Sequence, residues 1–194
     1  MNNVVELSVD ELPWDLLLQA DPDEDIIKSY IYETRIYVFY VSKEEGNEVH
    51  EVYEDGKLEE VREVHLIHED SSVDRVNGVD GANEEGNKVV GVLAVKKLSG
   101  DANYELMNIA VNNRFQRRGI ARKLILRAFS DMDLESVVTV RTGDISTEAV
   151  NLYESLGFVV VKTVENYFLD NYSEVIYEHG EVLKHQLIME KTII

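Results

Sequence analysis

The residues best suited to bind an anion lie in one stretch of 25 residues, from Leu106 to Ser130, which holds six arginines and lysines and no carboxylate. An apolar segment ends at Val111, a short polar loop follows, and Gly119 precedes apolar residues with the four-residue spacing of a helix face. A helix N-terminus presents N–H groups without intrahelical acceptors, and a glycine there lets a phosphate approach the backbone. The stretch therefore predicts a pyrophosphate site. The alternative is a cationic helix face that pairs with acidic residues elsewhere.

Two motifs resemble the signatures of the GNAT family of N-acetyltransferases. Residues 116–121 (QRRGIA) are similar to the acyl-CoA pyrophosphate loop of that family, Q/R-x-x-G-x-G/A, with alanine in the last position. Residues 151–158 (NLYESLGF) are similar to its second signature, here in the order N-x-Y-x-x-x-G-F. The resemblance is specific from about residue 88 to 194, where the C-terminal part is similar to a small bacterial subgroup of unassigned substrate. It is loose over 1–42 and absent over 43–87.

The resemblance implies that the chain binds acetyl-CoA. The pantetheine arm would lie between the strands expected at 104–111 and 136–141, where they separate, and would form strand-like hydrogen bonds with the first of them. The backbone amides that follow Gln116 would hold the pyrophosphate, and Asn151 would contact the pantetheine or its diphosphate side. The cofactor-binding residues expected on this basis are Ile109, Ala110, Val111, Gln116, Arg117, Arg118, Gly119, Ile120, Ala121, Arg122 and Asn151.

Two residues are the candidates for proton transfer. Tyr153 matches the tyrosine that the family places near the CoA sulfur, which implies a general acid for the departing thiolate. A phenol with a pKa of about 10 suits that role, and the alternative is a core aromatic on the buried side of its helix. Glu105, on the strand beside the cofactor, is the candidate general base, and the alternative is a solvent-facing glutamate. A water held by backbone carbonyls could instead accept the proton, with Asn108 as a positioning group.

The hydrophobic pattern predicts an α+β (mixed α/β) fold, a splayed mixed sheet with helices on both faces, as in the GNAT fold. Asp21 is expected to cap a helix with Pro22 at its first position, Ser146 or Thr147 to cap a later helix, and Gly157 to end that one. The segment between 164 and 185 is expected to be a loop. Strands are expected at 4–8, 35–42, 88–98, 104–111, 136–141, 158–164 and 185–193, and helices at 13–20, 22–32, 119–129 and 147–156.

Negative charge is concentrated between residues 43 and 86, where there are fifteen carboxylates and only four lysines and arginines. We expect 43–87 to form an acidic hairpin inserted into a single domain, 1–194. The hairpin would be either exposed to solvent or packed on a second subunit of a homodimer. Inside it, His65 and His68 are three residues apart, which in a strand places them on opposite faces, so no metal site is expected.

The chain of 194 residues has a formal net charge of −19 and no cysteine. Such a surface repels phosphate backbones and anionic lipid, so we expect neither nucleic acid nor membrane as a partner. The absence of cysteine and of a hydrophobic leader favours a cytoplasmic protein.

These features predict an acetyl-CoA-dependent N-acetyltransferase in which a primary amine of a small molecule or peptide attacks the thioester directly. Glu174 and Glu178 would favour a cationic amine. The aromatic side chains between 167 and 177 would either wall the acceptor pocket or pack as an ordinary core. The alternative function is a non-catalytic CoA-binding sensor or interaction scaffold of the same fold.

Overall fold

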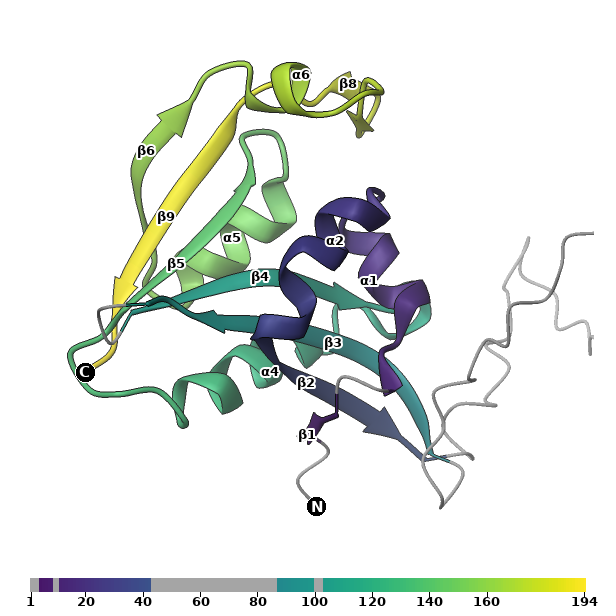
Figure 1. Cartoon of the computed structure of the whole chain (residues 1–194), viewed down its shortest axis with the longest axis vertical. Helices are drawn as coiled ribbons and strands as arrows, with labels where there is room; N and C mark the ends of the chain where they lie inside the picture. Colours follow the sequence, from purple (N-terminus) through teal and green to yellow (C-terminus); the bar gives the residue numbers. More distant parts are fainter. Residues whose placement is uncertain (1–3, 9–10, 43–86, 100–102) are drawn as a thin grey trace, which may run out of the picture.

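A mixed sheet of seven strands forms the frame of the protein (Figure 1). The structure is a computed structural model and describes residues 4–8, 11–42, 87–99 and 103–194. Its helices and strands are β1 (Val4–Leu7), α1 (Trp14–Ala20), α2 (Glu24–Tyr30), η2 (Ile31–Glu33), β2 (Thr34–Val41), β3 (Lys88–Lys97), β4 (Tyr104–Val111), η3 (Asn113–Phe115), α4 (Ile120–Phe129), β5 (Val137–Gly143), α5 (Thr147–Ser155), β6 (Val159–Val164), α6 (Tyr167–Asn171), β7 (Tyr177–Glu178), β8 (Glu181–Val182) and β9 (Gln186–Thr192).

The sheet divides between β4 and β5. Its strand order is β1-β2-β3-β4-β5-β9-β6, and β4 and β5 are its one parallel pair among the described strands. These two strands pair only over residues 104–106 and 138–140. Beyond that point the rest of β4 and of β5 are no longer paired with each other, so the strands separate toward their C-terminal ends. The predicted splay is confirmed.

Helices cover both faces of the sheet, as predicted (Figure 1). On one face, α1 and α2 pack on β2, β3 and β4 through fully buried side chains such as Leu17 and Ile27. On the other face, α4 contributes Leu124 and Ile125, and α5 contributes Tyr153 to a second apolar cluster. Burying each leucine or isoleucine contributes about 1.5–3 kcal/mol to folding. The two clusters hold the N-terminal ends of α4 and α5 beside the splay.

Strand β4 contains one residue more than the part of β3 that it pairs with. Ala94 lies opposite Asn108, whereas Val95 lies opposite Leu106, so Met107 is bulged out of the ladder. Leu106 and Ile109 face the α4 side, while Met107 and Asn108 both belong to the α1–α2 side. A regular strand would alternate and would turn Asn108 to the α4 side. The bulge therefore brings Asn108 against the helices that cover the other face.

The second helix begins later than predicted. Asp23, not Asp21, is its N-cap, and the Asp23 carboxylate accepts the N–H groups of Asp25 and Ile26. The Asp21 carboxylate instead accepts the N–H of Asp23 at 3.1 Å, which forms a tight turn between α1 and α2. Asp21 and Asp23 can each serve as an N-cap, and the turn formed by Asp21 decides between them. The Asp21 carboxylate therefore lies outside α2.

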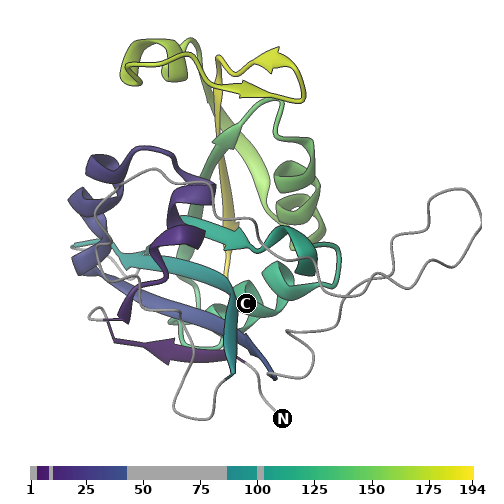
Figure 2. The same cartoon turned by 90° about the vertical axis from the view of Figure 1, so that its right-hand side faces the viewer.

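The prediction of a plain loop between 164 and 185 was wrong. This segment, which we call the arch (residues 165–184), contains the short helix α6 and the two-stranded ribbon β7–β8. The arch lies across the top of the molecule, with α6 on the side of α2 and the ribbon on the side of α5 (Figure 2). Ser146 donates to the Glu178 carboxylate at 2.5 Å, and His179 lies 3.1 Å from Glu148, so the ribbon is joined to the start of α5. The Ser146 hydroxyl therefore does not cap α5, although Ser146 holds the N-cap position.

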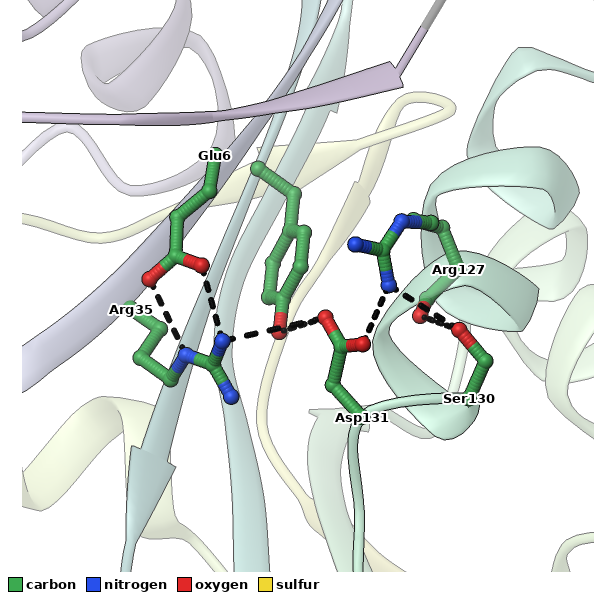
Figure 3. Close-up of polar contacts among 6 residues, drawn as sticks. Glu6, Arg35, Arg127, Ser130 and Asp131 are labelled. Carbon is green, nitrogen blue, oxygen red and sulfur yellow. Dashed lines mark hydrogen bonds and ion pairs between the residues drawn. The ribbon is translucent and has the colours of Figure 1, made fainter. Parts of the chain in front are cut away.

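A polar network joins the first two strands to the end of α4 (Figure 3). Arg35 of β2 donates two hydrogen bonds to Glu6 of β1, at 3.0 and 2.7 Å, and its guanidinium lies 3.8 Å from Asp131. Asp131 also accepts from Tyr37 at 3.1 Å and forms an ion pair with Arg127. A bidentate arginine–carboxylate pair within such a network holds its elements more firmly than an isolated surface pair. The network fixes α4 at the end opposite to Gly119.

The predicted insertion at 43–87, including its proposed dimer contact and the two histidines, lies outside the described residues except for Asn87. Within the described part of the chain, no helix is both long and apolar enough to cross a bilayer.

Candidate active site

A first cavity, of about 550 Å³, opens where β4 ends, between the N-terminal turns of α4 and α5. Ten of the eleven residues predicted to bind the cofactor line it: Ile109, Ala110, Val111, Gln116, Arg117, Gly119, Ile120, Ala121, Arg122 and Asn151. The eleventh, Arg118, does not line it. Its guanidinium lies over the Phe115 ring, 5.1 Å from the centroid.

The loop before α4 places unbonded N–H groups at this cavity. Arg117 and Gly119 both have left-handed backbone angles, with φ of 61° and 76°, and Gly119 is the N-cap of α4. The first i to i−4 hydrogen bond of the helix runs from Lys123 N to Gly119 O, at 3.0 Å. The N–H groups of the preceding turn therefore have no acceptor in the helix. A Cβ atom on Gly119 would meet no protein atom within 4 Å, so the space in front of it is open.

Two glutamine side chains hold the loop against β4. Gln116 donates to the Val111 carbonyl at 3.1 Å and to Asn113 at 3.0 Å. Gln19, at the end of α1, donates to the same two oxygens at 2.9 and 3.2 Å. Both lone pairs of the Val111 carbonyl are therefore used. Gln19 was missed in the sequence because nothing in the pattern of α1 distinguishes it from a surface glutamine.

The backbone of β4 offers further hydrogen-bonding groups to the splay. The Asn112 N–H donates to the Val90 carbonyl in β3. Because the direction of backbone hydrogen bonds alternates along a strand, the N–H and C=O groups of Ala110 also point to β3. Ile109 and Val111 therefore turn their N–H and C=O groups to the opposite side, where β5 has moved away. The Val111 carbonyl already accepts from Gln19 and Gln116. The groups that remain for a ligand are the N–H and C=O of Ile109 and the N–H of Val111.

The arginines of the first cavity form no ion pair with the described residues, although the carboxylate of Glu148 also lines this cavity. Among the residues that the structure describes, no carboxylate lies within ion-pairing distance of Arg117 or Arg122, whereas Arg127, farther along α4, pairs with Asp131. The sequence left open that the basic residues of this helix pair with acidic residues elsewhere. Arg127 does form such an ion pair, whereas Arg117 and Arg122 form none with the described residues.

A second cavity, of about 820 Å³, lies on the other side of the splay. The turn after α1 forms one wall and the arch forms the opposite wall. Carboxylates of Asp21, Glu105 and Glu178 line it, together with aromatic side chains from α2 and the arch: Tyr30, Tyr167, Phe168, Tyr172 and Tyr177. The predicted aromatic wall is therefore present. Glu174 does not line the cavity, and Glu178 is engaged by Ser146.

The two cavities meet at three residues, Ile109, Ala149 and Tyr153, which line both. Tyr153 is only 3% exposed, its ring packs edge-on against Phe158 at 5.6 Å, and none of the described residues forms a hydrogen bond with its hydroxyl. Burial raises the pKa of Tyr153 above its ordinary value, so the hydroxyl remains protonated near neutral pH. The ring of Tyr153 belongs to the core, and the residue lies where the cavities join, while its role as general acid stays a prediction.

Glu105 lines the second cavity at the point where β4 and β5 begin to separate. Its Oε1 accepts a hydrogen bond from Arg141 Nε at 2.6 Å, and its side chain is 14% exposed. Glu105 is therefore mostly buried and not solvent-facing. Because Oε1 accepts from Arg141, its other oxygen, Oε2, is the one that could accept a proton from a substrate. Asn108, the predicted positioning group, donates to Leu17 O and to Tyr30 Oη and is buried in the same wall.

Residues 81–160 match the family model described as "Acetyltransferase (GNAT) domain". This part of the chain is similar to a GNAT acetyltransferase domain. The match covers the strand β4, the loop at Gly119 and the helices α4 and α5, which are the elements that form the first cavity.

Curated relatives of the chain include a protein named as an N-acetyltransferase. It is 25% identical over 173 residues to "Uncharacterized N-acetyltransferase YvbK" of Bacillus subtilis, covering 88% of this chain and 82% of the relative. It is 36% identical over 84 residues to "N-acetylaspartate synthetase" of Danio rerio, covering 42% of this chain but only 30% of that protein. The chain thus spans most of the first relative and less than a third of the second.

A solved structure confirms the fold of the GNAT domain. A Bacillus subtilis acetyltransferase in complex with CoA superimposes with a TM-score of 0.68 at 21% identity, over 99% of both chains. At this identity the likeness concerns the arrangement of helices and strands, which agrees with the predicted splayed sheet.

Proposed function

We propose that this protein transfers an acetyl group from acetyl-CoA to a primary amine by direct attack. The observation that carries the proposal is that the two cavities meet at Ile109, Ala149 and Tyr153. The first cavity has open helix N–H groups and unpaired arginines, which suit a pyrophosphate. The second has carboxylates and aromatic rings, which suit an amine. A thioester from one side and an amine from the other would meet beside Tyr153.

The pyrophosphate would bind the N–H groups of the first turn of α4, with Arg117 and Arg122 close by. The pantetheine would follow β4, hydrogen-bonding to the free backbone groups of Ile109 and Val111. CoA is the ligand of the similar Bacillus subtilis structure, which supports the choice of CoA as the ligand. Asn151, exposed at the rim of the first cavity, would contact the pantetheine or its diphosphate.

The reaction would proceed in one displacement. The lone pair of the neutral amine attacks the thioester carbonyl carbon, and the C–S bond breaks. The thiolate takes the proton of the Tyr153 hydroxyl, which burial keeps protonated. The amine nitrogen loses its extra proton to Glu105, through the oxygen that Arg141 leaves free, or to a water between them. The products are an amide and free CoA.

The proposal is tested by following the CoA thiol released from acetyl-CoA in the presence of primary amines, with Tyr153→Phe measured in parallel. Amine-dependent thiol release that falls in the Phe variant is the expected result. Tight CoA binding without thiol release from any amine would instead show a CoA-binding sensor or scaffold. Absence of CoA binding would overturn both interpretations.

A further inference from the structure

Of the three carboxylates in the second cavity, that of Asp21 has neither a cation nor a histidine within ion-pairing distance among the described residues, whereas Glu105 pairs with Arg141 and Glu178 lies 3.8 Å from His179. Both cations in the wall are already paired: Lys96 with Glu33 and Arg141 with Glu105, each at 2.6 Å. Within the described part of the chain, the Asp21 carboxylate accepts hydrogen bonds only from the Asp23 N–H at 3.1 Å and from the Tyr172 hydroxyl at 3.4 Å. Burial raises the pKa of Asp21, which is the expected effect on a carboxylate that lacks a compensating charge.

Two further oxygens in the same wall have no donor. Asn108 Oδ1 and Gln186 Oε1 are the buried side-chain atoms of the described residues that lack a hydrogen-bond partner. Asn108 is 6% exposed and Gln186 is 5% exposed, and both line the second cavity. Buried polar atoms are normally bonded, so these two oxygens are acceptors that the protein itself leaves unsatisfied in this wall.

The contact between Asp21 and Tyr172 joins the two walls of the cavity. Asp21 lies in the turn between α1 and α2, and Tyr172 ends α6 in the arch. The Phe168 ring is tilted against Tyr172 with ring centroids 5.6 Å apart and lies edge-on to Tyr167 at 5.3 Å. The carboxylate therefore lies at the edge of a group of aromatic rings, whose faces attract a cation.

We propose that the acceptor is a linear diamine or polyamine, with one amino group at Tyr153 for acetylation and a second, protonated one held by Asp21 beside Phe168 and Tyr172. The identity of the acceptor rests on the proposed acetyl transfer. The groups left unsatisfied in the wall are acceptors, and polyamines carry N–H donors alone. A peptide or a sugar would also present carbonyl or hydroxyl oxygens, whereas the ammonium and guanidinium donors of this wall are already paired.

The test compares two acceptors with the same four-carbon chain, putrescine and n-butylamine, of which only putrescine carries a second amino group. We expect kcat/KM with acetyl-CoA to be at least about tenfold higher for putrescine, the effect of one charge-assisted hydrogen bond. Asp21→Asn keeps the size and the turn-forming oxygen of Asp21. It should lower kcat/KM for putrescine by about tenfold and leave n-butylamine unchanged. Asp25→Asn removes one negative charge from the exposed start of α2, outside the second cavity, and should affect neither amine.

A binding measurement separates this inference from the proposed function. Putrescine is titrated by calorimetry into the full chain saturated with CoA, with and without Asp21→Asn. Saturable binding that weakens about tenfold in the variant supports the second-ammonium site even if no amine is acetylated. Equal kcat/KM for the two amines, an equal effect of Asp21→Asn on both, or no putrescine binding to the CoA complex would overturn the inference while leaving acetyl transfer to other amines intact.

Discussion

Arg122 of α4 donates from one guanidinium nitrogen to both the hydroxyl and the carbonyl oxygen of Ser155 in α5, at 3.1 and 3.4 Å. These two helices flank the first cavity, and the contact joins Arg122, which lines it, to the C-terminal end of α5. The predicted role of Arg122 was a ligand of the pyrophosphate. The structure adds a second contact, because the same side chain links α4 to α5.

Gly119→Glu should abolish CoA binding. The φ of 76° disfavours any residue with a Cβ atom, and the open space in front of Gly119 would receive a carboxylate that repels the phosphates. We expect the dissociation constant for CoA to rise by more than about 100-fold, as measured by calorimetry. Gly119→Asn is the matched control, since asparagine tolerates this conformation without adding charge, and it should retain part of the affinity. Unchanged affinity in the Glu variant would contradict the pyrophosphate site.

Tyr153→Phe should lower kcat by about 10²–10⁴, with little change in the KM for acetyl-CoA, which is the range for loss of one acid–base group. The fold should persist because the phenyl ring retains its contact with Phe158. Since burial raises the pKa of Tyr153, the ratio of wild-type to variant rate should stay constant from about pH 6 to pH 10. A variant of nearly normal rate would reduce Tyr153 to a packing residue.

Glu105→Gln should lower kcat/KM by about 10²-fold at neutral pH, where the solvent holds little base that could replace the carboxylate. The deficit should shrink at alkaline pH, because hydroxide can then take the extra proton that the nitrogen carries after its attack on the thioester. The Gln side chain retains an oxygen for Arg141, so the contact between β4 and β5 is preserved. Steady-state kinetics over a pH series measures this. A small, pH-independent effect would show that a water held by backbone carbonyls accepts the proton.

Asp131→Asn should destabilise the protein at neutral pH but not in acid. Burial alone would raise the pKa of Asp131, but hydrogen bonds from Arg127 and Tyr37 outweigh it and lower the pKa. A lowered carboxyl pKa contributes stability above the unfolded value, of about 4, and that stability is lost as the pH falls through the folded value. We expect a loss of up to about 1 kcal/mol at pH 7 by urea denaturation. Asp144→Asn, at an exposed position without these partners, should show no such pH dependence.

Asp21→Asn should raise the melting temperature of the unliganded protein at neutral pH, by about 1–2 °C. The pKa of Asp21 is raised by burial, so its ionised form is disfavoured in the folded state. This destabilisation appears as the pH rises above the unfolded value and vanishes below it. Thermal melts at pH 7 and at about pH 3 measure the difference. A lower melting temperature at pH 7 would show that Asp21 is stabilised by contacts that the inference leaves out.

Sequence reasoning predicted the regular elements well where the pattern was long. Strands β3 and β4 fall within one residue of their expected ends, and Gly157 ends α5 with φ of 89°, because only glycine adopts that angle readily. The same reasoning failed where two local solutions compete. Asp21 and Asp23 are both good caps, and the short α6 and β7–β8 lack enough residues for a periodic signal.

The candidate site was predictable only in its local part. The residues around Gly119 are contiguous in sequence, so their motif indicated the whole loop. Gln19 and Asp21 lie about 90 or more residues from the groups that they contact, Val111 and Tyr172, and no local pattern marks such pairs. The pairing of Glu105 with Arg141 likewise follows from the register between β4 and β5, which only the folded sheet establishes.

The bulge at Met107 makes the spacing within β4 part of the site. One extra residue returns Ile109 and Val111 to the side of the first cavity after two neighbours have faced the other helices. Deleting Met107 would restore strict alternation and would leave Leu106 opposite Val95 and Asn108 opposite Ala94, so each half of β4 would keep its partners in β3 and its face of the sheet. The bulge therefore adds one side chain to the α1–α2 face without changing the register on either side of it. A strict two-residue alternation counted along the sequence would assign Leu106 and Ile109 to opposite faces, although both face α4.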